Sequence, residues 1–210
     1  MSGLDNPGSL FVIVAPSGAG KTSLVRALLQ NESDVRLSVS FTTRQPRPGE
    51  RDGVDYRFVS VEEFERRRGE GEFLEWARVH DNLYGTSRAW IEAQMAAGQD
   101  IILEIDCQGA EQVRHLYSDA VGIFIAPPSI EELARRLRAR AQDSETVIRR
   151  RIDAAQAELA QAAQFEYVII NQDFGVALEQ LRAVVRAARL RYSRQLARNP
   201  GVFSQLRLVR

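Results

Sequence analysis

Residues 10–22 read LFVIVAPSGAGKT, and this stretch decides the fold. Its first five residues are apolar and mostly β-branched, a pattern typical of a strand buried in a parallel sheet. Residues Ser23 to Gln30 then show helical spacing. A strand, a glycine-containing loop and a helix in this order predict an α/β protein built on a parallel sheet.

The loop between this strand and helix has the spacing of a phosphate-binding loop (P-loop). It comprises Ala15, Pro16, Ser17, Gly18, Ala19, Gly20, Lys21 and Thr22. Backbone N–H groups and the positive end of the helix dipole suit a nucleotide's phosphates. Lys21 supplies a point charge for the β- and γ-phosphates, and Thr22 offers a hydroxyl to Mg²⁺. Ala15 stands where the general pattern has glycine, but this position ends the strand, so we expect little effect on function. A plain turn joining a strand to a helix is the alternative interpretation.

The composition narrows the function classes. Of 210 residues, 44% are hydrophobic and 27% charged, enough for one compact core. The 28 basic and 28 acidic residues cancel, which argues against a general nucleic-acid or membrane binder. We find no leader pattern and no apolar run long enough to span a membrane, so a cytoplasmic protein is expected. Lys21 is the only lysine among the 28 basic residues. Cys107, the single cysteine, is expected to be a small buried hydrophobe.

Further segments extend the α/β pattern. Buried strands, each followed by a plausible helix, are predicted at Ile101–Ile105, Val121–Ile125 and Tyr167–Ile170. Capping-box spacing predicts helix starts at Ser60 with Glu63 and at Ser129 with Glu132. Between Ser38 and Gly98, short strands and turn residues indicate an inserted lobe. The arginine-dense stretch from Arg136 to Arg151 predicts a mobile flap between two helices.

A second set of polar residues occupies the lobe and the end of a core strand. These are Ser40, Arg44, Arg47, Tyr56, Glu75, Tyr84, Thr86 and Asp106. The segments that carry them, SVSFTTRQPRPGE, VDYRF, EFLEWA, NLYGTS and LEIDCQG, resemble the guanylate kinase family. The resemblance extends from about Ser9 to the C-terminal helix. It implies a P-loop NTPase core, an inserted mixed α/β lobe that binds the nucleoside monophosphate, and a lid.

The resemblance also implies transfer of the γ-phosphoryl group of MgATP to GMP, and to dGMP. Residues matching Arg44, Arg47, Tyr56 and Tyr84 would hold the GMP phosphate. Those matching Ser40, Glu75, Thr86 and Asp106 would contact guanine. The chemistry is reasonable, because guanidinium groups pair with phosphate oxygens and the N1–H and N2 amino group of guanine need acceptors. Arg44 and Arg47 lie in a loop without a nearby run of acids, which favours an anion ligand over a surface ion pair.

The lid and the donor site follow from the same resemblance. Arg136, Arg140 and Arg151 match lid arginines that close over the ATP phosphates, and with Lys21 and Arg44 they complete the implied catalytic set. Asn171 matches a position beside adenine. The family usually has glycine where Ala141 stands and an acid where Gln172 stands. For Mg²⁺, Thr22 is the direct ligand, with Glu104 or Asp106 contributing through water.

The implied organisation is a guanylate kinase-like domain over residues 8–188, with a basic helical extension at 189–210. Within the domain we expect a core (8–38, 98–135 and 151–188), a lobe (39–97) and a lid (136–150). The stretch from Arg186 to Arg210 has seven arginines and no acid. A helix with a solvated basic face is one interpretation, and a contact for self-association or for a polyanion is the other. A homo-oligomer is left open.

Two other functions compete with the first. One is a non-catalytic guanylate kinase-like module that binds phosphopeptides, against which the intact P-loop argues. The other is a kinase of the same fold that acts on a ribose bisphosphate. Taken singly, Tyr56, Tyr84 and Glu75 would be ordinary packing or surface residues. Only their joint placement supports a nucleotide site.

Overall fold

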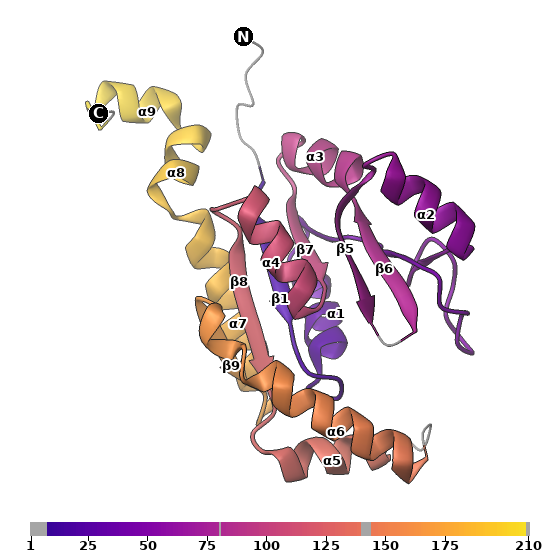
Figure 1. The fold of residues 1–210 in the computed structure, drawn as a ribbon. Coiled ribbons are helices and arrows are strands. Elements are labelled where there is room, and N and C mark those ends of the chain that lie inside the picture. Colours follow the sequence, from indigo (N-terminus) through magenta and orange to yellow (C-terminus); the bar gives the residue numbers. More distant parts are fainter. Residues whose placement is uncertain (1–7, 80, 140–143, 209–210) are drawn as a thin grey trace.

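The core of the computed structural model is a five-stranded parallel sheet in the order β2-β7-β1-β8-β9 (Figure 1). The structure describes residues 8–79, 81–139 and 144–208. The core strands are β1 (Leu10–Val14), β2 (Val35–Leu37), β7 (Asp100–Glu104), β8 (Val121–Ala126) and β9 (Tyr167–Ile170). The predicted α/β fold is confirmed, and the predicted strand bounds agree with the observed ones to within one residue.

Helices cover both faces of this sheet. They are α1 (Lys21–Asn31) and α7 (Phe174–Arg189) on one face, and α3 (Arg88–Ala96) and α4 (Cys107–Leu116) on the other. Side chains of β1 alternate between them, as a strand period of two requires. Phe11 and Ile13 pack with α1 and α7, whereas Leu10, Val12 and Val14 pack with α3 and α4. Both faces of β1 are therefore buried, which explains its continuous apolar sequence.

A second, four-stranded sheet in the order β4-β3-β6-β5 lies where the sequence predicts an inserted lobe. Its elements are β3 (Phe41–Thr42), β4 (Arg57–Phe58), β5 (Phe73–Val79), β6 (Asn82–Ser87) and helix α2 (Val61–Gly69). Phe41, Phe64, Phe73 and Leu83 form a small hydrophobic core of their own. The lobe therefore has a hydrophobic cluster of its own. Figure 1 shows strands β5 and β6 of the lobe beside the core sheet.

Both predicted helix starts are confirmed. The Ser60 hydroxyl accepts a hydrogen bond from the Glu63 N–H at 3.2 Å at the start of α2. The Ser129 hydroxyl accepts one from the Glu132 N–H at 3.1 Å before α5 (Ile130–Ala139). Each bond satisfies one of the free N–H groups of a first helical turn.

The expected flap from Arg136 to Arg151 is mostly helical, which corrects the sequence interpretation. Its two ends belong to α5 and to α6 (Glu145–Leu159), which Ser144 caps. Leu137 and Ile148 are buried between these helices, together with Leu133 and Ala155. Widely spaced apolar residues were enough to pair the helices, although the stretch between them is polar. Residues 140–143, which include Arg140 and Ala141, lie outside the described residues.

The chain continues through η1 (Ala162–Gln164) and, after α7, through α8 (Tyr192–Arg198) and α9 (Pro200–Gln205). The last two helices extend away from the core sheet at the upper left of Figure 1. The expectation of one helix with a solvated basic face is wrong for Arg194, which is buried and pairs with Asp119 at 2.9 Å. No helix within the described segments has the length and apolar character needed to cross a membrane.

A buried ion cluster ties the end of α7 to the core. Asp100 is 1% exposed, and its carboxylate accepts from the Ser9 N–H at 2.7 Å and from Arg189 Nε at 2.6 Å. Arg189 also pairs with Glu32 at 3.0 Å, as does the more exposed Arg186 at 2.9 Å. Arg189 is thus the arginine that bridges Asp100 and Glu32.

We expect Arg189→Ala to lower the free energy of unfolding by about 3–5 kcal/mol, because it leaves the buried Asp100 carboxylate without its cation. The control is Arg186→Ala: that side chain is 55% exposed, so its removal is expected to change stability by about 1 kcal/mol or less. Urea denaturation measures both values. Equal small losses in the two variants would contradict this assignment.

Candidate functional site

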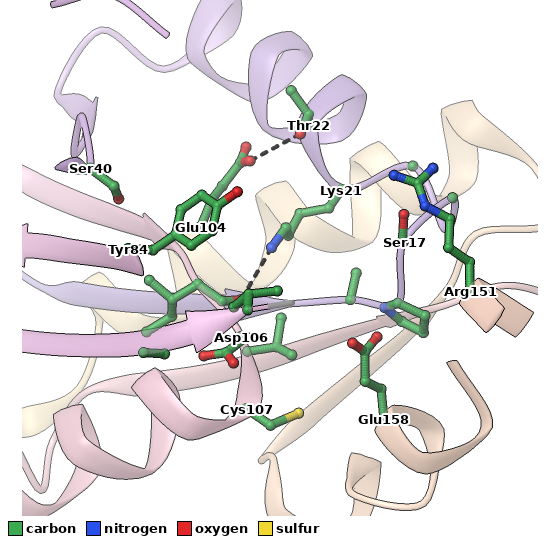
Figure 2. A pocket seen from close by; sticks show the side chains of 18 of the residues that line it. Ser17, Lys21, Thr22, Ser40, Tyr84, Glu104, Asp106, Cys107, Arg151 and Glu158 are labelled. Carbon is green, nitrogen blue, oxygen red and sulfur yellow. Dashed lines mark hydrogen bonds between the residues drawn. The ribbon is translucent and has the colours of Figure 1, made fainter. Parts of the chain in front are cut away.

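A cavity of about 300 Å³ opens between the carboxyl ends of the core strands and the lobe (Figure 2). Most of the predicted site residues line it. They are Ala15, Pro16, Ser17, Gly18, Gly20, Lys21, Thr22, Ser40, Arg47, Tyr56, Glu75, Tyr84, Glu104, Asp106 and Arg151. Figure 2 shows Ser17 and Arg151 toward one end, and Ser40 and Tyr84 toward the other. One space therefore joins the predicted donor and acceptor sets.

The P-loop has a backbone that its glycines make possible. Gly18 and Gly20 both have φ of 97°, in the left-handed region that favours glycine. A Cβ at Gly20 would lie 2.3 Å from Nδ2 of Asn171. That amide donates to the Ala19 carbonyl at 2.7 Å, so the loop is fixed from the end of β9.

Lys21 and Thr22 begin α1 and point into the cavity (Figure 2). Lys21 Nζ donates to the Ile105 carbonyl at 3.1 Å. The Thr22 hydroxyl donates to Oε2 of Glu104 at 3.0 Å. Oε1 of Glu104 is buried and has no hydrogen-bond partner among the described residues. Two residues predicted to act near Mg²⁺ thus lie in direct contact.

The predicted guanine-contacting residues include two neighbouring carboxylates, the buried Glu75 and the half-buried Asp106. Glu75 is 3% exposed, and the Thr86 hydroxyl donates to it at 2.6 Å. Asp106 caps α4 by accepting from the Gly109 N–H at 2.9 Å. A Cβ at Gly109 would fall 2.5 Å from Oε2 of Glu75, so glycine allows α4 to approach the lobe closely. Ser40 is also buried, and it lines the same cavity.

The structure corrects one expectation about the predicted phosphate clamp. Arg44 does have an acidic neighbour, because the turn after Arg47 brings Glu50 back to pair with it at 2.8 Å. The Arg47 N–H also donates to Glu50, at 2.7 Å. The Arg44 guanidinium lies over the Tyr56 ring at 5.3 Å, and that ring meets Tyr84 edge-on. Arg44 is therefore an oriented side chain next to the cavity.

Two of the three predicted lid arginines can be placed. Arg136, on α5, donates to the Asn171 carbonyl at 2.9 Å and pairs with Glu132 at 2.7 Å. Arg151, on α6, lines the main cavity. Arg140 lies outside the described residues. A second cavity, next to the P-loop, is lined by Gly18, Gly20, Ser23, Arg135, Arg136, Ala139, Asn171, Gln172 and Phe174.

A family model described as guanylate kinase matches residues 8–188. The chain belongs to the guanylate kinase family. Curated relatives named guanylate kinase include one from Dechloromonas aromatica, 57% identical over 199 residues, covering 95% of this chain and 98% of the relative. One from Ralstonia nicotianae is 58% identical over 200 residues, covering 95% and 90%. A crystal structure of guanylate kinase from Anaplasma phagocytophilum is similar at a TM-score of 0.77 and 34% identity, over 90% of each chain.

A guanylate kinase acts on charged nucleotide phosphates, and such reactions typically use a divalent cation. The residues present fit Mg²⁺. Thr22 offers a hydroxyl, and the buried Glu104 Oε1 beside it needs a positive or hydrogen-bonding partner. Hard oxygen donors with room for water are the ligands that Mg²⁺ prefers.

One charged residue of the cavity, Glu158 on α6, was not predicted from the sequence. Burial raises its pKa, which the nearby Lys21 lowers in part and Asp106 raises further. Glu158 stands seven residues after Arg151, so both lie on one side of the helix. From this spacing, the presence of Glu158 in the cavity could have been predicted. The predicted burial of Cys107 is confirmed. This burial, and to a smaller extent the charge of Glu158, raises the pKa of the Cys107 thiol to about 11.

Glu75 has a pKa well above the ordinary value for a carboxyl group. Burial raises the pKa of Glu75 to about 7; the hydrogen bond from Thr86 opposes this shift and the charge of Asp106 adds to it. A raised carboxyl pKa means that the folded protein holds the proton more tightly than the unfolded chain does. The contribution of Glu75 to stability is therefore full below its ordinary pKa of 4.5 and lost as the pH rises through 7.

Glu75→Gln should accordingly stabilise the nucleotide-free protein at high pH, because the amide carries no charge to bury. Relative to the wild type, its free energy of unfolding should rise by about 2–3 kcal/mol between pH 5 and pH 8.5. Urea denaturation at the two pH values gives the comparison. If the difference in free energy of unfolding between variant and wild type does not change with pH, the buried charge of Glu75 does not destabilise the folded protein.

Proposed function

We propose that this guanylate kinase transfers the γ-phosphoryl group of MgATP to GMP, giving ADP and GDP, and that it also accepts dGMP. One observation carries the proposal: a P-loop and a buried group of hydrogen-bond acceptors share one cavity. The P-loop suits the donor triphosphate. The acceptor group suits guanine, which presents two donors, N1–H and the N2 amino group, on one edge.

On the donor side, the N–H groups at the start of α1 would hold the β-phosphate, and Lys21 would leave the Ile105 carbonyl for the β- and γ-oxygens. Arg136 and Arg151 would approach the same phosphates from α5 and α6. Arg140 completes the proposed lid. The second cavity, with Asn171 on its wall, would take adenine.

The positive charge of a bound Mg²⁺ would offset the negative charge that develops on the phosphates. Thr22 would be its direct protein ligand. Glu104 would contact Mg²⁺ through a water molecule. Its Oε2 already accepts a hydrogen bond from Thr22, and its Oε1 has no hydrogen-bond partner among the described residues. Asp106 is the alternative outer ligand.

On the acceptor side, Arg44, Arg47, Tyr56 and Tyr84 would hold the GMP phosphate. Glu50 already orients Arg44, which reduces the side-chain entropy lost when the phosphate binds. The reaction needs in-line placement of the phosphate beside the γ-phosphoryl group and the exclusion of water. The donor and acceptor residues line one cavity, which suits the first need, and the lobe beside it would limit the access of water.

Guanine would bind with N1–H and the N2 amino group facing Glu75, while Thr86, Ser40 and Asp106 complete the contacts. Adenine has an unprotonated N1 at this edge, so an acceptor would face a buried carboxylate. Such mismatches disfavour binding by roughly 1–3 kcal/mol each. A ribose bisphosphate acceptor would leave Glu75 without a partner, which argues against that alternative. A phosphopeptide module would not require Lys21.

We also propose that the enzyme works in the cytoplasm on ATP and GMP, with no nucleic-acid or membrane partner. The division into core, lobe (39–97) and lid (136–150) belongs to the same proposal.

An ADP-release assay with GMP, dGMP, AMP, UMP and ribose phosphates tests the function directly. Turnover with GMP and dGMP alone is expected, and preferred turnover of a sugar phosphate would overturn the proposal.

Lys21→Ala is expected to lower kcat by about 10²-fold or more while the fold stays intact, because the change removes transition-state charge stabilisation and no core packing. Steady-state kinetics give kcat, and circular dichroism checks the fold. Wild-type turnover in a folded variant would mean that the P-loop assignment is wrong.

Glu75→Gln is expected to lower the ratio of kcat/KM for GMP to that for AMP by at least about tenfold, mainly through loss on GMP. A rotated amide can donate to adenine N1, whereas it contacts guanine less well than a carboxylate does. Arg44→Ala is the control, because it removes phosphate binding common to both nucleotides and should leave the ratio unchanged. An unchanged ratio in Glu75→Gln with an altered one in Arg44→Ala would reverse the two roles.

A further inference from the structure

An ion pair joins the core to the lobe at the edge of the site. Arg26 Nη2, on α1, lies 3.0 Å from Oδ1 of Asp55, in the lobe. Arg26 stands one helical turn after Thr22, and Asp55 directly precedes Tyr56. We propose that Arg26 and Asp55 are positioning residues that hold Tyr56 in place in the cavity wall before GMP binds, and so set the affinity for the acceptor nucleotide. This inference rests on the proposed function.

Helices on both faces of the core sheet contact the lobe. On one face, the Gln112 side chain of α4 donates to the Trp76 carbonyl at 2.7 Å and accepts from the Trp76 N–H at 3.2 Å. These two bonds fix β5 to the core. On the opposite face, α1 reaches the lobe through the Arg26–Asp55 pair. Tyr56 follows Asp55 and Glu75 precedes Trp76 in the chain, and both Tyr56 and Glu75 line the cavity. The pair therefore restrains a part of the cavity wall that the α4 contacts do not fix.

The lobe segment that carries Asp55 is internally bonded. The second oxygen of Asp55 accepts from the Arg51 N–H at 2.9 Å. The Gly53 N–H donates to the Tyr56 carbonyl at 2.7 Å, and the Asp52 carboxylate accepts from the Phe58 N–H at 2.9 Å. Because these bonds close residues 51–58 into one turn, a force on Asp55 is transmitted to Tyr56.

The exposure of the pair sets the size of the effect. The side chain of Arg26 is 66% exposed and that of Asp55 is 20% exposed, so water and salt weaken the attraction. Exposed ion pairs of this kind change an equilibrium by about two- to fivefold. The pair exists before GMP binds and need not change during phosphoryl transfer. It should therefore act on the KM for GMP and leave kcat unchanged.

A double-mutant cycle tests the pair. Arg26→Gln and Asp55→Asn remove the charges, while the asparagine oxygen can still accept from the Arg51 N–H. We expect each variant to raise the KM for GMP two- to fivefold at low salt, with no further rise in the double variant. The kcat and the KM for ATP should stay at wild-type values, and 0.5 M salt should bring the wild type close to the variants. Arg36→Gln, at an exposed position of β2, is the matched control and should change none of these.

Hydrogen exchange of the nucleotide-free protein provides a measurement that does not depend on activity. Backbone amides of residues 51–58 should exchange faster in Arg26→Gln than in the wild type or in Arg36→Gln. Additive effects in the cycle, a lower KM for GMP, or unchanged exchange would overturn the role of the pair. If the wild type fails to phosphorylate GMP, the proposed function fails, and the exchange rates still decide whether the pair holds the lobe.

Discussion

The site depends on the left-handed backbone of Gly20 at the start of α1. This conformation turns the chain from β1 into the helix so that Lys21 and Thr22 face the cavity. Asn171 holds the preceding residue, Ala19, by its carbonyl, and the space left for that amide excludes any side chain at Gly20. A loop fixed in this way loses little entropy when a phosphate binds. The P-loop is therefore prepared for its ligand by contacts with the end of β9.

On the side of the cavity predicted to bind GMP, a buried carboxylate lowers the stability of the folded protein. Glu75 is buried with Asp106 nearby, and burial raises its pKa although Thr86 donates to it. A carboxylate in such a place destabilises the empty protein above neutral pH. The same carboxylate is what guanine needs, because only an acceptor pairs with N1–H and the N2 amino group. In the proposed function, selectivity for the base would therefore be obtained at the expense of stability in the nucleotide-free state.

The fold and the composition of the site could be predicted because both depend on patterns of residues that are close together in the sequence. The apolar run of β1, the glycine spacing up to Lys21 and the caps at Ser60 and Ser129 each depend on neighbours within a few residues. The resemblance of short segments to a known family then placed Glu75 and the other lobe residues in one set. Nearly all of them line one cavity or touch residues that do.

What the sequence alone determined is the type of each element and the chemistry available to it, since hydrophobic period, caps and glycine conformation are local. Tertiary structure decided which distant charges meet. Arg44 pairs with Glu50 because a turn folds back, Glu158 reaches the cavity because α6 packs beside it, and Arg26 reaches Asp55 across two units of the fold. Such meetings depend on how helices and sheets pack in space, which no local pattern encodes.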